Sequence, residues 1–225
     1  MGTNCYLVSS VADCLIIDPG DEADFITQTI LENKLKPIAI VLTHGHFDHV
    51  LGCLELKLNF DIPIMLHKKD KKLYTSANQS AKHWQKTPKG PFQGKTLKVP
   101  PVDQFIKEGD EIKIGDEFLK VIETPGHTPG SICLVYHPQT TNDSKANHGP
   151  ATRGDITISN SIIFTGDTLF ADGVGRTDFS YSSPLQLTKS LDQLKKLPQN
   201  TTVFPGHGNQ TILKESLSPK NSSLL

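Results

Sequence analysis

The chain has 225 residues, a mean hydropathy of −0.30 and a net charge of −1, which results from 23 basic and 24 acidic side chains. This length is sufficient for a buried core, and we expect residues 1–225 to form a single domain. The balanced charge gives no reason to expect nucleic acid or an anionic membrane as a partner, and no apolar run approaches the ~18 residues that cross a bilayer.

Short apolar segments rich in β-branched residues recur along the chain and are typical of strands. In chain order they are Cys5–Val8, Cys14–Ile17, Ile38–Leu42, Pro63–Leu66, Phe118–Ile122, Ile132–Tyr136, Ile162–Thr165 and Thr202–Phe204. Three segments between them repeat apolar residues at helical spacing, and these are Asp21–Leu35, Val50–Leu58 and Pro184–Leu197. Because hairpin-like pairs of strands alternate with single helices, the pattern predicts a layered α/β fold.

Two polar stretches interrupt this pattern. Residues 68–101 are rich in Lys, Pro, Gly and Gln, and residues 137–160 are polar and weakly patterned. We expect both stretches to be surface excursions from the domain, and the second to be an inserted loop between two strands. The residues from about 213 onward are expected to form a flexible tail.

The start of the chain and its cysteines indicate the compartment. The first 20 residues carry neither the basic region nor the continuous apolar run of a signal peptide. The four cysteines, Cys5, Cys14, Cys53 and Cys133, stand singly in apolar segments without CxxC spacing. We therefore expect buried free thiols and a cytoplasmic location, with an organellar location left open if a longer precursor exists.

Side chains that can bind metals follow four of the expected strands, each time at a sharp turn. These turns are THGHFDH, PGH, TGD and PGHG, and their candidate ligands are His44, His46, Asp48, His49, His127, Asp167 and His207. Loops past strand ends converge on one edge of a sheet in α/β proteins, and the glycines beside the ligands permit tight turns. The pattern predicts one metal centre.

The spacing within THGHFDH suits ligands. His44 and His46 are two residues apart, so on an extended segment they project to the same side. Asp48 and His49 then begin a helix, whose N-terminus favours a carboxylate. Imidazoles and carboxylates suit zinc, iron or manganese, with zinc the default for a histidine-rich set. Seven ligands exceed what one ion needs and suit two divalent ions that share a carboxylate.

The ordered motifs resemble the metallo-β-lactamase superfamily, and within it the short, single-domain hydrolases similar to glyoxalase II (hydroxyacylglutathione hydrolase). The resemblance extends from about Asn4 to Thr211 and includes TNCYLV, IIDPG, TPGHTPGS and GDTLFADGVGRTDF. It implies a four-layer αβ/βα sandwich with the metal ions at one edge.

The resemblance also implies roles for the candidate residues. It implies that Asp167 bridges two ligand sets, which are His44, His46 and His127 for the first ion and Asp48, His49 and His207 for the second. Asp48 and Asp167 are the carboxylates implied to act in catalysis. Asp18, in the IIDPG turn, would support the ligands from behind, and a simple turn residue is its alternative role.

The implied reaction is the attack of a metal-bridging hydroxide on a thioester carbonyl. S-2-hydroxyacylglutathione, such as S-lactoylglutathione, fits such a site best, because a thiolate leaves without a dedicated general acid. Arg176 in GVGRTDF is a candidate for binding an anionic group of the substrate, and a structural salt bridge is its alternative role.

Two features depart from the family pattern. Classical glyoxalase II enzymes carry a larger helical C-terminal region that helps to bind glutathione, whereas few residues follow His207 here. The family usually has a glycine-rich turn after GRTDF, whereas this chain reads SYSSP. Both departures leave the substrate contacts open.

Two other functions stay open at this point. Persulfide dioxygenases share the His-x-His-x-Asp-His motif and use a single iron held by two histidines and a carboxylate. A non-catalytic metal-binding module would keep the fold without turnover, although the intact ligand set argues against it. The sequence specifies no oligomeric state.

Overall fold

The first β-sheet has five strands and carries the N-terminal part of the chain. The computed structural model describes residues 2–84, 98–138 and 161–218. The strand order is β1-β2-β3-β4-β5, with an antiparallel β1–β2 hairpin and parallel pairing between the remaining neighbours. The strands are β1 (Tyr6–Ser10), β2 (Asp13–Ile17), β3 (Lys36–Val41), β4 (Ile64–His67) and β5 (Gln104–Ile106).

The second sheet has six strands, ordered β13-β12-β9-β8-β7-β6. Only β12 and β9 pair in parallel, and the other neighbours are antiparallel. The strands are β6 (Glu111–Ile114), β7 (Glu117–Glu123), β8 (Ile132–Tyr136), β9 (Ile162–Gly166), β12 (Thr202–Pro205) and β13 (Thr211–Ile212). A separate two-stranded ribbon, β10 (Leu169–Phe170) with β11 (Gly173–Val174), follows β9.

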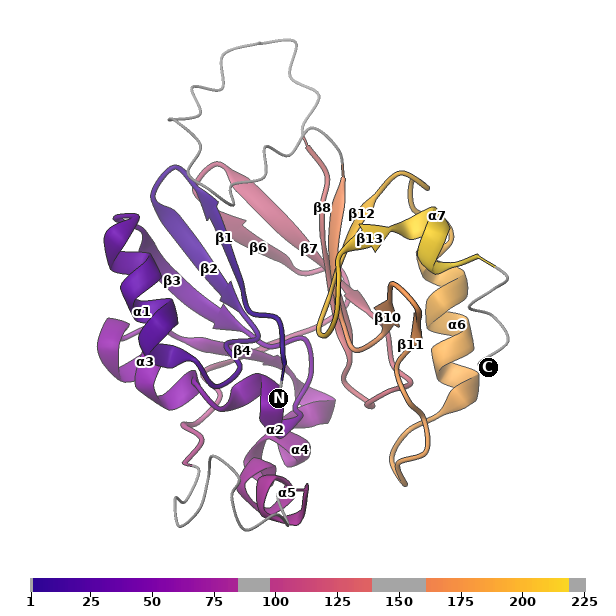
Figure 1. Cartoon of the computed structure of the whole chain (residues 1–225), viewed down its shortest axis with the longest axis horizontal. Coiled ribbons are helices and arrows are strands. Elements are labelled where there is room, and N and C mark those ends of the chain that lie inside the picture. The colour runs from indigo at the N-terminus through magenta and orange to yellow at the C-terminus, as the bar shows by residue number, and fades with distance from the viewer. Residues whose placement is uncertain (1, 85–97, 139–160, 219–225) are drawn as a thin grey trace.

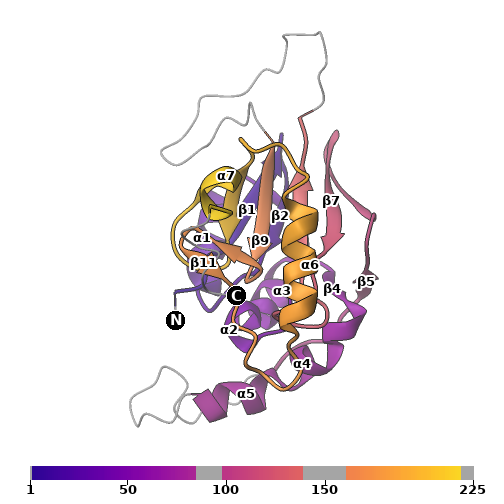
Figure 2. The same cartoon turned by 90° about the vertical axis from the view of Figure 1, so that its right-hand side faces the viewer.

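Helices cover the outer faces of both sheets (Figure 1). Those that follow the strands of the first sheet are α1 (Ala23–Glu32), α2 (Phe47–Val50), α3 (Cys53–Phe60), the 3₁₀ helix η1 (Lys68–Asp70), α4 (Lys71–Thr75) and α5 (Ala77–Trp84). Those of the second sheet are α6 (Pro184–Leu194) and α7 (Leu213–Ser216). Figure 2 shows α6 running along the outer face of the second sheet.

Three buried apolar clusters define the four layers. In β2, Leu15 and Ile17 belong to the cluster between the two sheets, whereas Ile16 belongs to the cluster beneath α1 and α3. This alternation follows from the two-residue period of a strand. The third cluster lies between the second sheet and α6, and burying each such side chain contributes roughly 1.5–3 kcal/mol. The expected four-layer αβ/βα sandwich is confirmed.

The expected strands all occur, with small shifts at their ends. The helix expected over Val50–Leu58 is divided into α2 and α3, and the other two expected helices are shorter than predicted. The α6 helix begins where Pro184 indicated, because the Ser183 hydroxyl accepts a hydrogen bond from the Gln186 N–H at 3.3 Å. The short strands β5, β6 and β13 were not predicted.

The structure differs from the surface excursion expected over residues 68–101. Residues 68–84 form η1, α4 and α5, and Asp70, Tyr74 and Ala77 are buried. The lysines conceal this pattern in the sequence, because they occupy the exposed side while the apolar residues recur at helical spacing on the other. Residues 85–97, and 139–160 of the second excursion, lie outside the described residues.

The expectation of a flexible tail from about 213 also needs correction. Residues 213–216 form α7, and Leu213 is fully buried against the second sheet. The polar side chains of KESLSPK hide this single apolar anchor in the sequence. Residues 219–225 lie outside the described part of the chain.

The burial of three of the four cysteines agrees with the expectation from the sequence. All four cysteines are free thiols, with Cys14, Cys53 and Cys133 buried and Cys5 partly buried. Burial raises the pKa of the Cys133 thiol to about 12, so this side chain behaves as a small apolar group. Within the described ranges, no helix is both long enough and apolar enough to cross a membrane.

Candidate metal centre

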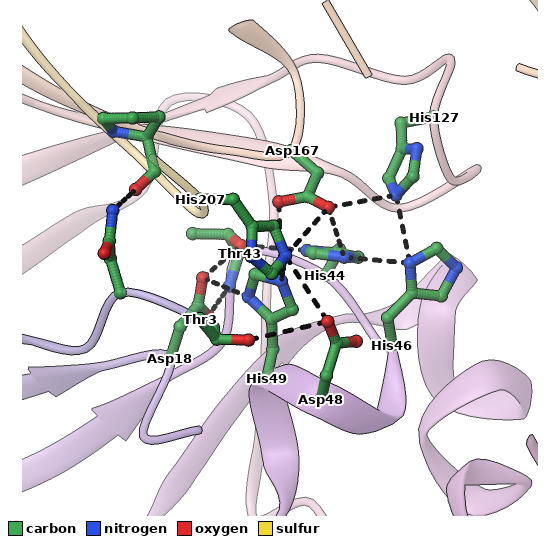
Figure 3. A network of polar contacts seen from close by, with 12 residues as sticks. Thr3, Asp18, Thr43, His44, His46, Asp48, His49, His127, Asp167 and His207 are labelled. Carbon is green, nitrogen blue, oxygen red and sulfur yellow. Dashed lines mark hydrogen bonds and ion pairs between the residues drawn. The ribbon is translucent and has the colours of Figure 1, made fainter. Parts of the chain in front are cut away.

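The predicted ligands come together at one edge of the sandwich, where loops leave the ends of β2, β3, β7, β9 and β12 (Figure 3). The β3 loop is extended through His46, which precedes the first turn of α2 with φ −71° and ψ 146°. This conformation places two histidines on the loop and the next two ligands, Asp48 and His49, on the helix. This one segment therefore supplies ligands to two neighbouring groups, one from its loop and one from its helix.

The first ligand group consists of His44, His46, His127 and Asp167, whose ligand atoms all lie within 4.8 Å of one another. His46 Nδ1 lies 3.1 Å from His44 Nε2 and 3.0 Å from His127 Nε2. Asp167 Oδ2 lies 3.6 Å from His127 Nε2. His44 and His127 are buried, so this group is closed to solvent on most sides.

The second ligand group consists of Asp48, His49 and His207 and meets the same 4.8 Å limit. His207 Nε2 lies 3.3 Å from His49 Nε2 and 3.4 Å from Asp48 Oδ2. Asp167 reaches this group as well, because its Oδ1 lies 3.4 Å from His49 Nε2 and its Oδ2 lies 3.6 Å from His207 Nε2. The Asp167 carboxylate thus lies between the two groups, as Figure 3 shows.

The outward ring nitrogen of each histidine has its own partner, which fixes the direction of the ring. His49 Nδ1 faces the Asp18 carboxylate at 3.0 Å, and a carboxylate can only accept, so this nitrogen carries the hydrogen. The other outward contacts are His127 Nδ1 to the Arg176 carbonyl at 2.9 Å, His207 Nδ1 to the Gly2 carbonyl at 3.0 Å, and His46 Nε2 to the Tyr181 hydroxyl at 2.8 Å. When these rings are neutral, a carbonyl or carboxylate partner leaves a lone pair on the inward nitrogen of His49, His127 and His207.

Asp18 also orients His44, through a threonine. The Thr43 hydroxyl donates to Asp18 Oδ2 at 2.6 Å, so its oxygen accepts from His44 Nδ1, which lies 3.0 Å away. The Thr43 N–H donates to Asp18 Oδ1 at 2.8 Å. Asp18 is buried and has a positive φ of 48°, a conformation that aspartate tolerates better than most residues. Its oxygens are occupied by these contacts, which suits a supporting role.

Residues 2–4 contact the last ligand, His207, its loop and the neighbouring Asp48. Besides the Gly2 carbonyl beside His207, Asn4 donates from its backbone N–H to the Gly206 carbonyl at 2.8 Å and from Nδ2 to the Gly208 carbonyl at 2.8 Å. The Thr3 hydroxyl lies 3.5 Å from Asp48 Oδ2. This N-terminal segment therefore fixes the loop that carries His207.

The two groups differ in the protonation that their surroundings favour. Burial and the neighbouring imidazoles lower the pKa of His44 well below its ordinary value and that of His46 to about 3. In the second group, burial opposes the charged form of His49, but Asp167 and Asp18 outweigh it and raise its pKa well above 6.5. The hydrogen bond with Asp48 raises the pKa of His207. The surroundings thus favour neutral imidazoles in the first group and protonated imidazoles in the second.

The residues fit divalent metal ions. Asp167 Oδ1 is a buried oxygen that accepts no hydrogen bond from the described residues and faces His49 Nε2 at 3.4 Å, and a bound cation would compensate its burial. The inward nitrogens face one another, an arrangement that is unfavourable for lone pairs alone and favourable around a cation. Histidine nitrogens and carboxylate oxygens are ligands that zinc, iron and manganese accept.

Arg176 forms the salt bridge that was the alternative to anion binding. Its Nε and Nη2 lie 2.6 and 2.5 Å from the two carboxylate oxygens of Asp178, and its guanidinium lies over the Phe179 ring at 4.6 Å. Phe179 in turn stacks on Tyr181, with ring centroids 5.3 Å apart. These residues lie beside the first group, because Phe179 and Tyr181 both contact the His46 ring.

Three residues around the site were not predicted from the sequence. Thr43 and Tyr181 contact ligand histidines, and Asp70 bonds to the loops that carry them. Tyr181 lies in the SYSSP segment, which departs from the family pattern. This departure was the feature of the sequence that could have indicated a residue specific to this site. Asp70 stands within the lysine-rich KKDKK segment, where nothing distinguishes it from a surface residue.

The sequence matches a family of known proteins over most of its length. The family model described as the metallo-beta-lactamase superfamily matches residues 1–141 and 154–207, which is most of the chain. The chain belongs to the metallo-β-lactamase superfamily. The resemblance noted in the sequence is therefore confirmed at the level of the superfamily.

Curated relatives of this chain include proteins with functional names, among them the following two. The probable metallo-hydrolase YqgX of Bacillus subtilis is 34% identical, over 92% of this chain and 86% of its own length. The hydroxyacylglutathione hydrolase GloC of Haemophilus influenzae is 31% identical, over 93% of this chain and 87% of its own length. Both relatives are thus similar to this superfamily member over almost its full length.

Solved structures whose fold is similar to that of almost the whole chain include the following two. TTHA1623 in a di-iron-bound form is 33% identical with a TM-score of 0.76, and the match covers 97% of this chain and 93% of that chain. ETHE1 from Myxococcus xanthus is 25% identical with a TM-score of 0.68, covering 97% of this chain and 78% of that chain. The first comparison indicates that a closely similar fold binds a pair of metal ions.

Proposed function

We propose that the chain is a metal-dependent hydrolase that cleaves the thioester bond of S-2-hydroxyacylglutathione. The observation that carries this proposal is the position of the Asp167 carboxylate between two complete groups of ligands. The substrate class is supported by the similarity to the hydroxyacylglutathione hydrolase GloC.

The proposed cofactor is a pair of divalent ions, with zinc favoured by the imidazoles and iron or manganese compatible with the same donors. His44, His46 and His127 would hold one ion, Asp48, His49 and His207 the other, and Asp167 both. When bound, such ions lower the pKa of water toward neutrality and polarise a carbonyl oxygen.

The chain's own residues would orient the reactants. The hydrogen bond with His207 and the nearby His49 outweigh burial and lower the pKa of Asp48, so this carboxylate remains ionised and can hold a ligand or a water molecule by accepting a hydrogen bond. Hydrolysis adds water across the C–S bond, giving a carboxylic acid and a thiol. Because a thiolate is a good leaving group, we assign no general acid.

Substrate binding is proposed on the side of the first group. The stacked Phe179 and Tyr181 rings offer an apolar wall beside His46. Arg176 is more than half exposed and would bind a carboxylate of the glutathione moiety by exchanging its partner Asp178. An uncharged thioester has no carboxylate that could replace Asp178 at Arg176, so this contact would favour the glutathione conjugate.

Metal analysis combined with a thioesterase assay on S-lactoylglutathione tests the proposal. We expect two divalent ions per chain and metal-dependent release of glutathione, which His46→Ala abolishes and Asp103→Asn leaves unchanged. Asp103 is a suitable control, because it pairs with Lys57 and bonds the Ile64 N–H at the start of β4. Full turnover by His46→Ala would contradict a catalytic role of the metal centre.

The second candidate function is that of a mononuclear iron persulfide dioxygenase, which the similarity to ETHE1 supports. The complete second ligand group argues against it, because a single iron needs no ligands from Asp48 and His207. One iron per chain together with thiol-dependent oxygen uptake would favour this alternative over thioester hydrolysis.

A further inference from the structure

A buried carboxylate lies behind the first ligand group and joins its two loops. Asp70, the last residue of η1, is fully buried. Its Oδ2 accepts hydrogen bonds from the Gly45 N–H at 2.9 Å and the Thr128 hydroxyl at 2.6 Å, and its Oδ1 accepts one from the Gly130 N–H at 2.6 Å. These bonds supply the partners that a buried carboxylate requires.

All three donors belong to ligand loops. Gly45 stands between His44 and His46, and Thr128 follows His127 directly in the chain. One loop leaves β3 of the first sheet and the other leaves β7 of the second sheet. Asp70 therefore links, through charge-assisted hydrogen bonds, two loops from different sheets that must meet for the first group to form.

The close approach of Asp70 explains the glycines in both loops. A Cβ atom at Gly45 would lie 2.8 Å from the Asp70 carbonyl oxygen and 2.9 Å from the Tyr74 nitrogen. A Cβ atom at Gly130 would lie 2.7 Å from Asp70 Oδ1. All three distances are too short for real contacts. Only glycine therefore allows each loop to approach the Asp70 segment this closely.

We propose that Asp70 is the positioning residue of the first ligand group and that the second group does not depend on it. The hydrogen bonds described for its carboxylate reach the loops of His44, His46 and His127, and none reaches Asp48, His49 or His207. The inference rests on the proposed function only in that the two groups bind metal ions, and it holds for any substrate.

Asparagine at this position is a sharp test, because it keeps the shape of aspartate. The side-chain amide has one acceptor oxygen and one NH₂ donor, so either Gly130 or the Gly45–Thr128 pair would face a donor. Asp70→Asn therefore removes the negative charge and at least one of the two backbone N–H hydrogen bonds, from Gly45 or from Gly130. Asp103→Asn is the matched control, because Asp103 also accepts a backbone N–H bond, from Ile64, but at the opposite end of β4.

The experiment is a competition titration of Zn²⁺ against a chromophoric chelator, performed on the full chain. His127→Ala and His207→Ala assign the two binding steps to the first and the second group. In Asp70→Asn we expect the first-group affinity to fall about 10- to 100-fold, as for other lost outer partners of ligands, while the second-group affinity is unchanged. Asp103→Asn should leave both affinities unchanged.

Equal weakening of both steps, or no weakening of either, would overturn the inference. If Asp70→Asn fails to fold, Thr128→Val decides instead, because it removes one of the three bonds, and Thr128→Ser restores the hydroxyl. Weakening of the first step by valine and its rescue by serine support the inference, and equal affinities in the two variants contradict it. A wild-type chain that binds no pair of ions would contradict the proposed function instead.

Discussion

The two ligand groups share Asp167 but differ in burial and charge. His44 and His127 are 1% and 3% exposed, whereas in the second group only His49 is fully buried, and His207 and Asp48 are 33% and 16% exposed. Apart from the shared Asp167, the first group consists of imidazoles whose pKa is lowered, whereas carboxylates raise the pKa of the imidazoles in the second. The first group is therefore prepared for a cation, and the second must release protons to bind one.

The groups also differ in how they are held. The backbone loops of the first group are fixed from behind by Asp70, whereas His49 of the second group is oriented directly by the side chain of Asp18. His207 depends on the N-terminal segment. The comparison suggests that the two positions differ in metal affinity and respond to different substitutions.

Removing the charge of Asp167 should have the largest effect, because this carboxylate serves both groups. In Asp167→Asn we expect both ions to bind more weakly and hydrolysis to fall by more than the roughly 100-fold that a lost outer partner costs. Metal content and initial rates with S-lactoylglutathione measure the effect. Retention of both ions would show that the two groups are independent of the shared carboxylate.

Acidification should release the second ion before the first. The pKa of His49 and that of His207 are raised above 6.5, so protons compete with the metal at a higher pH than at His46, whose pKa is lowered to about 3. A zinc indicator followed during a pH titration should report two steps, and His207→Ala should lack the step at higher pH. Simultaneous release would contradict the difference between the groups.

Asp18→Asn should weaken the second group more than the first, because Asp18 contacts His49 directly and His44 only through Thr43. The amide loses the charge that orients His49, and we expect the affinity of the second ion to fall about 10- to 100-fold. The first group keeps its contacts with Asp70 and is affected only through the Thr43 hydroxyl beside His44, so we expect a smaller loss of affinity for its ion. This substitution is the counterpart of Asp70→Asn, so measuring both in one titration series sharpens the comparison.

Tyr181→Phe should have the smallest effect. It removes the hydroxyl that lies 2.8 Å from His46 Nε2 and keeps the ring stacked on Phe179. Because Tyr181 is partly exposed, water can replace the hydroxyl, and the first-group affinity should fall by less than about tenfold. A larger loss of first-group affinity, measured by the same chelator titration, would show that Tyr181 is a positioning residue, as is proposed for Asp70.

The candidate ligands were readable from the sequence, because each is a chemically distinctive residue after an apolar strand and beside glycine. The bridging position of Asp167 came from the family resemblance, and the structure places its carboxylate within 4.0 Å of four histidines. Asp70 was not readable, because its role arises from contacts between three segments that are distant in the chain. Its four lysine neighbours gave the segment the composition of a surface loop.

The hydrogen bond between His207 and the Gly2 carbonyl joins residues 205 positions apart. Contacts of such long range form late, because the chain must close a large loop before they contribute to stability. During synthesis, the second ligand group therefore stays incomplete until His207 has left the ribosome. A metal ion that binds earlier can use the ligands of the His-x-His-x-Asp-His segment and His127, and His207 would add its nitrogen last.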